Sequence, residues 1–222
     1  MFPNLADPAI SEEDSGGISL SRQAFQRLRE QIVTLKLPPG APLQESALVE
    51  ELGLGRTPIR EALQWLACQG LVVLQPRRGA FVANIGVTDL QQLFELRQEL
   101  EGYAAALAAG RATADDVAGL EQILADLDEA GDTQAHIEVD RAFHHALARS
   151  THNKFLRSTL SRLYYLNLRL WYLVLDRIGP MHRAVEQHRA VVTAIKDHDS
   201  QKAEAAIRKH IADFQERIRA AI

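Results

Sequence analysis

From about residue 88 to the end of the chain, apolar residues recur at spacings of three and four, which place side chains on one face of an α-helix. Glycines, Asn153 and the pair Gly179–Pro180 interrupt this pattern. The pattern predicts six helices, at about residues 88–110, 113–130, 133–151, 153–175, 181–198 and 200–221. Helices with one apolar face must bury it against each other, so residues 88–222 are predicted to form an all-helical bundle.

The residues before position 88 show a different pattern, with both helices and strands predicted. Residues 1–18 mix Pro, Gly, Asp and Ser without periodicity, and we expect a flexible tail there. Three helices are predicted next, at about residues 20–36, 44–52 and 57–69. Two short apolar runs, at about 71–74 and 80–82, flank a turn and are predicted to form a hairpin. Three helices and a hairpin, the wing, form a winged helix-turn-helix over residues 19–85. The predicted fold class is therefore mainly α, with this module ahead of the bundle.

Composition and charge narrow the class of protein. A single cysteine, Cys68, excludes an internal disulfide and is typical of a reducing compartment. No run of about eighteen apolar residues predicts a membrane span, and the N-terminus lacks the features of a signal peptide, so we expect a cytoplasmic protein. Residues 19–85 hold eight basic and five acidic residues, although the whole chain has a net charge of −4. A locally basic module on an acidic body suits a DNA-binding domain.

The third predicted helix has the properties of a DNA-recognition helix. Thr57 is expected as its N-cap and Pro58 as its first residue. Arg56 then lies just before the helix and Arg60 lies one turn into it, where a guanidinium can bond guanine or a phosphate. Arginines at the tip of the wing could reach the DNA backbone or the minor groove; these are Arg77 and Arg78. The alternative is that all of them are solvated surface arginines on ordinary helices.

Residues 19–85 resemble the winged-helix domain of the GntR family of transcriptional regulators. The resemblance is carried by Leu37–Gly40, Leu43–Glu45, Arg56–Leu63, Gly70–Val72 and Pro76–Val82. It implies that Arg56, Thr57 and Arg60 lie at DNA-contact positions. Gly55 departs from the usual Ser or Thr, and Ser46 replaces an arginine of some relatives, so this chain lacks those two phosphate contacts.

In the bundle, polar residues interrupt five of the apolar stripes. They are Arg97, Asp140 with His144, Asn167, His188 and His210. Burying a polar group without a partner costs about 1–3 kcal/mol, so the economical interpretation is that these groups converge on one polar cavity. Asp140 and His144 are four residues apart and share a helix face. Three imidazoles and one carboxylate suit a divalent ion such as zinc, nickel or manganese, although each could instead be a satisfied core residue.

Residues from about 89 to 210 also resemble the FCD ligand-binding domain of the FadR subfamily. The resemblance is carried by Glu95–Arg97, Leu100–Glu101, Asp140, Phe143–His144, Glu186–Arg189 and His210. It implies that Asp140, His144, His188 and His210 coordinate a divalent metal. The count of six helices is closer to the VanR-like branch than to the branch that binds fatty acyl-CoA.

A guanidinium on a buried stripe requires an anion, because arginine cannot be neutralised. We expect Arg97 to bind the carboxylate of a small organic acid together with the metal, and Asn167 to add polar contacts. The alternative partner of Arg97 is Glu101, four residues further along the helix.

These expectations combine into a DNA-binding regulator. A homodimer would bind a palindromic operator, and an effector would relieve repression by favouring one conformation of the protein. Two alternatives stay open. In one, the metal itself is the signal; in the other, the bundle is a metalloenzyme in which the ion activates water. The metalloenzyme alternative leaves the winged helix without a role.

Overall fold

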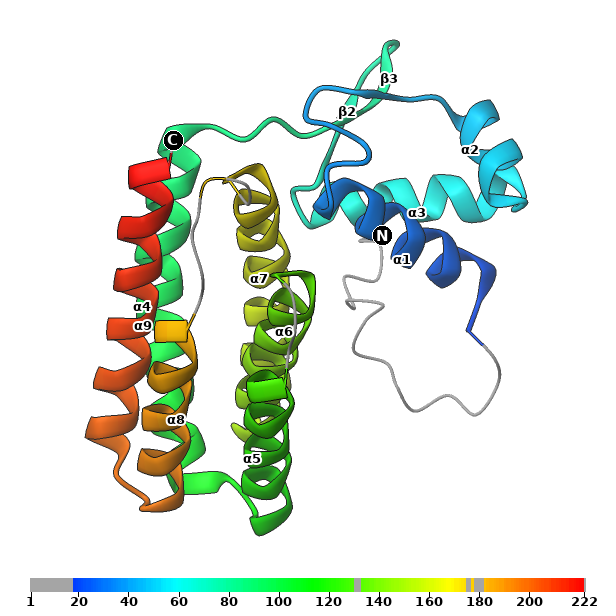
Figure 1. The fold of residues 1–222 in the computed structure, drawn as a ribbon. Coiled ribbons are helices and arrows are strands. Elements are labelled where there is room, and N and C mark those ends of the chain that lie inside the picture. Colours follow the sequence, from blue (N-terminus) through cyan, green and yellow to red (C-terminus); the bar gives the residue numbers. More distant parts are fainter. Residues whose placement is uncertain (1–17, 130–132, 175–176, 178–181, 222) are drawn as a thin grey trace. The chain divides into compact units, whose positions relative to one another are not determined.

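The computed structural model describes residues 18–129, 133–174, 177 and 182–221 (Figure 1). The predicted tail, residues 1–18, lies outside the described residues except for Ile18. The chain divides into two compact units. The first consists of the described residues up to Gly86 with Leu168–Leu173, and the second consists of Val87–Asn167 with the residues from Val174 onward.

The first unit is a winged helix-turn-helix, as predicted. Its helices are α1 (Leu20–Val33), α2 (Glu45–Leu52) and α3 (Arg56–Cys68), and its strands are β1 (Pro42–Leu43), β2 (Val72–Gln75) and β3 (Gly79–Val82). The strands form an antiparallel sheet in the order β1-β3-β2, and Gln75 pairs with Gly79 next to the turn at the tip of the wing. Strand β1 was not predicted, because two residues are too short to show a sequence period.

The core of this unit lies between α1 and α3. Helix α1 buries Phe25, Leu28 and Ile32, and α3 buries Ile59, Leu63 and Leu66, at the spacing of three and four that one helix face requires. Burial of each of these large side chains stabilises the fold by roughly 1.5–3 kcal/mol. This core fixes the orientation of α3, whose exposed side carries Arg56 and Arg60.

Two predicted helix ends need correction. The N-cap of α3 is Gly55, not Thr57, because the extended backbone of Gly55 starts the helix at Arg56. The hydroxyl of Thr57 therefore lies inside the first turn and is exposed. Helix α1 was expected to reach residue 36 but ends at Val33, because Leu35 takes a left-handed conformation (φ +61°) that closes the helix.

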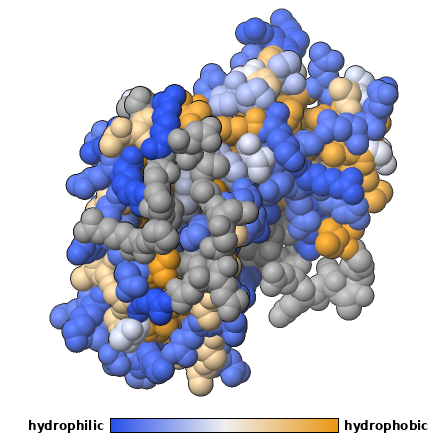
Figure 2. Space-filling view, viewed as in Figure 1, coloured by the Kyte–Doolittle hydropathy of each residue, from blue (hydrophilic) through white to orange (hydrophobic). Residues whose placement is uncertain are grey.

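The described residues from Val87 onward form six helices, in agreement with the prediction, and all of them belong to the second unit except for Leu168–Leu173 of the fourth helix. They are α4 (Val87–Arg111), α5 (Ala114–Glu129), α6 (Thr133–Ser150), α7 (Lys154–Val174), α8 (His182–Lys196) and α9 (Ser200–Ala221). Helix α9 packs against α4 and α8, while α5 packs against α6 and α8 (Figure 1). The helices bury most of their apolar residues. Most of the coloured surface in Figure 2 is hydrophilic. None of the helices in the described ranges is long and apolar enough to cross a membrane.

Candidate metal centre and nucleic-acid interface

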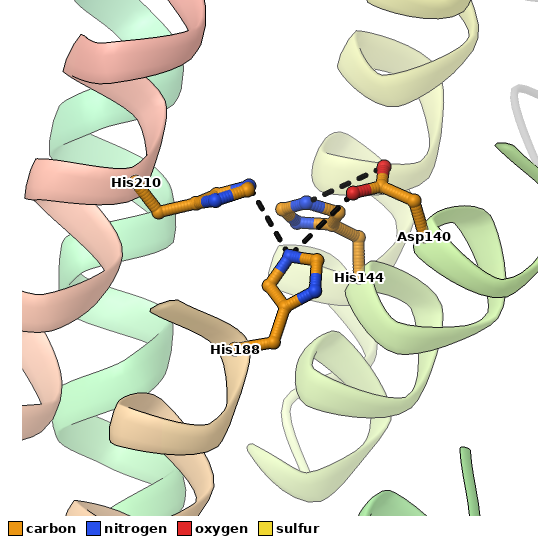
Figure 3. A group of neighbouring side chains, drawn as sticks. All are labelled: Asp140, His144, His188 and His210. Carbon is orange, nitrogen blue, oxygen red and sulfur yellow. Dashed lines mark hydrogen bonds and ion pairs between the residues drawn. The ribbon is translucent and has the colours of Figure 1, made fainter. Parts of the chain in front are cut away.

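Four buried side chains from three helices meet inside the bundle (Figure 3). Asp140 and His144 lie on successive turns of α6, His188 comes from α8 and His210 comes from α9. One ligand atom of each lies within 4.8 Å of the others. The Nε2 atom of His188 is 3.2 Å from Nε2 of His210 and 3.5 Å from Oδ1 of Asp140. A tetrahedral ion with bonds of about 2.0–2.1 Å places its ligand atoms roughly 3.3 Å apart, and these two separations are close to that value.

Hydrogen bonds on the outer side of the cluster orient three of these groups. Nδ1 of His144 is 2.6 Å from Oε2 of Glu101, and Nδ1 of His210 is 3.2 Å from Oε1 of Gln187. The hydroxyl of Tyr164 donates to Oδ2 of Asp140 at 2.8 Å. When a carboxylate or amide oxygen accepts the Nδ1 proton, the lone pair of the ring lies on Nε2. Both Nε2 atoms then face the centre of the cluster as potential metal ligands.

Burial favours the neutral form of two imidazoles of the cluster, those of His188 and His210. It lowers the pKa of His188 well below its ordinary value, with smaller effects from His210 and His144. It also lowers the pKa of His210 to about 3, together with the charges of His144 and Arg97. Neutral imidazole is the form that coordinates a metal. Burial also raises the pKa of Asp140, which the charge of a bound cation would oppose.

Arg97 and Asn167 are buried, and each has a polar atom that could bind a ligand. The Nε atom of Arg97 donates to Oε1 of Glu101 at 2.6 Å, so the internal pair that the sequence left open is formed. Burial would raise the pKa of Glu101, but Arg97 and His144 hold it well below its usual range. Among the described residues, Nη1 of Arg97 and Oδ1 of Asn167 have no hydrogen-bond partner.

Two cavities reach this cluster. One, of about 240 Å³, lies between α8 and α9 and includes His210, Gln187, Asp213 and Phe214 in its lining. The other is about 10 Å³, a single water in size, and lies beside His144 and Tyr164. The larger cavity therefore connects the cluster to the α8–α9 side of the bundle.

Three of the five predicted DNA-contact residues gather around one hollow of the first unit. Arg60 of α3 and the wing residues Arg77 and Arg78 line a hollow of about 570 Å³ together with Glu45 of α2. Oε2 of Glu45 is 2.7 Å from Nε of Arg60. Gln64 also lines the hollow, whereas Arg56 and Thr57 are exposed at the start of α3 and are not part of its lining.

Sequence reasoning missed three side chains that orient these sites. Tyr164 lies on α7 in an apolar run that gives its hydroxyl no distinguishing signal. Gln187 stands next to His188 in the sequence, but its contact with His210 depends on how α8 packs against α9. Glu45 was noted only as part of a family motif, and its partner is fifteen residues away in another helix. None of these contacts has a fixed sequence spacing.

Comparison with known proteins identifies both parts of the chain. Residues 20–82 match the family described as "Bacterial regulatory proteins, gntR family", and residues 92–213 match the FCD domain. The chain belongs to the GntR family. The six helices among the described residues beyond residue 86 are consistent with the VanR-like branch of the FadR subfamily.

Several relatives of this GntR protein are named as regulators. It is 30% identical over 181 residues to a probable D-xylose utilization operon transcriptional repressor of Paenarthrobacter nicotinovorans, covering 81% of this chain and 80% of that protein. It is 28% identical over 203 residues to the transcriptional repressor RspR of Escherichia coli, covering 90% and 89%. The solved structure of E. coli McbR/YncC matches with a TM-score of 0.82 and 26% identity, covering 92% of this chain and 99% of McbR. The chain is therefore a transcriptional regulator and not an enzyme.

Proposed function

We propose that this GntR regulator is a repressor whose operator binding is controlled by a small organic acid held beside a divalent metal ion in the FCD domain. The observation that carries the proposal is the convergence of three imidazoles and one carboxylate in a buried site. Unligated groups of this kind are costly to bury, whereas an ion satisfies all four together. Nitrogen-rich ligands favour zinc, with nickel or manganese as alternatives.

The charges around the site favour an anionic effector. Arg97 and Glu101 offset each other, and a divalent cation with Asp140 leaves an excess of positive charge. The ion would attract a carboxylate oxygen, while Nη1 of Arg97 and the amide of Asn167 would hold and orient the acid. The cavity of about 240 Å³ beside His210 provides space for a small molecule to approach.

In this proposal residues 19–85 bind DNA, and residues 88–222 bind the effector and form a homodimer. Arg56, Thr57 and Arg60 contact the major groove, and Arg77 and Arg78 contact the backbone or the minor groove. A two-fold dimer would match a palindromic operator. The acid relieves repression only if it binds the DNA-free conformation more tightly than the DNA-bound one.

Native mass spectrometry with metal analysis tests the central claim. We expect a dimer with about one divalent ion per chain that gains one molecule of acid from a panel of small carboxylic acids. A metal-free protein that binds none of the acids would overturn the proposal. Operator release caused by metal alone, without any acid, would replace it with direct metal sensing.

Calorimetry on Arg97→Lys tests how the acid is held. Lysine keeps the positive charge next to Glu101 but cannot donate from Nε and Nη1 at the same time. We expect the affinity for the acid to fall by roughly tenfold or more, since charge-assisted bonds contribute about 1.5–3 kcal/mol. Arg149→Lys, on the exposed side of α6, is the matched control and should bind the acid as the wild type does. Unchanged affinity in Arg97→Lys would remove Arg97 from the site.

A further inference from the structure

Glu45 and Arg60 form an ion pair on the surface that faces DNA in the proposed function. Glu45 is the first residue of α2, and Arg60 lies in the second turn of α3. Their side chains line the same hollow as Arg77 and Arg78, and their contact uses Nε of the guanidinium. Both remain accessible, with side-chain exposures of 38% for Glu45 and 63% for Arg60.

Folding stability does not explain this pair. An exposed ion pair contributes little to the free energy of unfolding, because water screens the charges and two long side chains lose freedom. A carboxylate on a DNA-facing surface also repels phosphates and so lowers affinity for every duplex. A role in selecting the DNA sequence accounts for a residue that otherwise opposes binding.

We propose that Glu45 is a positioning residue that orients Arg60 for reading a guanine and so sets the sequence preference of the regulator. Nε of Arg60 is occupied by Glu45, which leaves the two Nη groups as the donor edge. That edge matches the O6 and N7 acceptors of guanine in the major groove. This inference rests on the proposed role of Arg60 in DNA reading.

The contact also limits the alternatives open to Arg60. A free arginine has many rotamers and can turn toward a phosphate, a contact that carries no sequence information. Held by Glu45, the side chain is already ordered before DNA arrives, so less conformational freedom is lost on binding the correct base. Glu45 therefore lowers general affinity for DNA and raises discrimination between sequences.

The test begins with an operator recovered by in vitro selection from random duplex DNA with the full-length wild-type protein. The affinities for this operator and for an unrelated duplex are then measured for Glu45→Gln. Glu61→Gln is the matched control, because it removes the same charge from the same domain while its carboxylate contacts Ser21 of α1. Thermal unfolding of both variants checks that the fold is intact.

We expect Glu45→Gln to reduce the ratio of operator to unrelated-duplex affinity roughly tenfold, and a repeated selection to show a relaxed guanine preference at one position per half-site. Glu61→Gln should raise both affinities by similar factors and leave the ratio unchanged. In an Arg60→Ala background, Glu45→Gln should cause no further loss of the ratio. If Glu45→Gln leaves the affinity ratio unchanged, as expected for Glu61→Gln, the positioning role of Glu45 is overturned, while DNA reading by Arg60 is not. Failure of the wild type to enrich any sequence would overturn DNA reading by Arg60, and the role of Glu45 with it.

Discussion

His188 and His210 face each other through their Nε2 atoms, 3.2 Å apart, although they come from different helices. Burial lowers the pKa of both rings, so neither carries a charge at neutral pH. If the contact is a hydrogen bond, one ring supplies the proton and the other its lone pair. A shared cation removes this constraint, since both rings can then direct a lone pair to the same centre.

This arrangement predicts a metal-dependent stability. We expect a chelator to lower the thermal midpoint and added zinc to restore it, with a gain of about 2.7 kcal/mol when zinc exceeds its dissociation constant about 100-fold. His188→Ala should lose this zinc-dependent shift, because it removes a ligand. His152→Ala alters an exposed histidine that contacts Asp116, and it should retain the shift. Equal shifts in all three proteins would place the zinc outside the cluster.

The packing of α4 against α9 predicts the effect of an alanine at Gly102. A Cβ there would lie 2.7 Å from Nε of Arg208, and Arg208 is held by a bidentate pair with Glu99. The gain of about 1 kcal/mol in helix propensity should therefore be offset by the displaced ion pair. Urea unfolding should show Gly102→Ala to be neutral or destabilising.

Two further variants make this prediction specific. Gly119→Ala, in α5, meets nothing within 4 Å and should stabilise the protein by about 0.5–1 kcal/mol. Gly102→Ala introduced into an Arg208→Ala protein should show the same gain, because the obstructing side chain is gone. Destabilisation by Gly102→Ala in that background would point to a clash with a different group.

The turn of the wing predicts opposite effects on stability and on DNA binding. Arg77 has a left-handed backbone (φ +64°), which is unfavourable for a residue with a Cβ. Arg77→Gly should raise the stability of the first unit by up to about 1 kcal/mol. If Arg77 contacts a phosphate, the same change should weaken DNA binding and reduce the slope of log K against log salt by about 0.9. Arg78→Ala should weaken binding without the gain in stability, and an unchanged salt slope in both would exclude the wing from the contact.

The first turn of α5 predicts a pH-dependent contribution to stability. Burial raises the pKa of Asp116, but hydrogen bonds with Thr113 and His152 outweigh it and lower the pKa. A lowered pKa in the folded state stabilises the fold above the unfolded pKa of about 3.9, and this contribution is lost as the pH falls below it. Asp116→Ala should thus cost about 1–2 kcal/mol at neutral pH and progressively less in acid. Urea midpoints across this range test it, with the exposed Asp115→Ala as the control that should show a smaller loss.

Much of the fold could be predicted because each helix shows its buried face in the sequence. The six bundle helices were located to within a few residues at each described end, and the wing was recognised from its flanking apolar runs. Errors arose where one residue's backbone decided the boundary. Gly55 starts α3 ahead of Thr57, and the left-handed Leu35 ends α1 early. Neither conformation is visible in a hydrophobic period.

The candidate sites could also be predicted only in part from the sequence. The sequence by itself indicated six of the buried polar residues, because Arg97, Asp140, Asn167 and the three histidines interrupt apolar stripes. Only the tertiary structure decided which of them meet. It placed His210 against Gln187 of α8, Tyr164 against Asp140 of α6, and Arg60 against Glu45 of α2. Periodicity along one helix specifies the direction of a side chain, whereas a contact between helices also depends on their relative rotation and register, which the packing of the whole core decides.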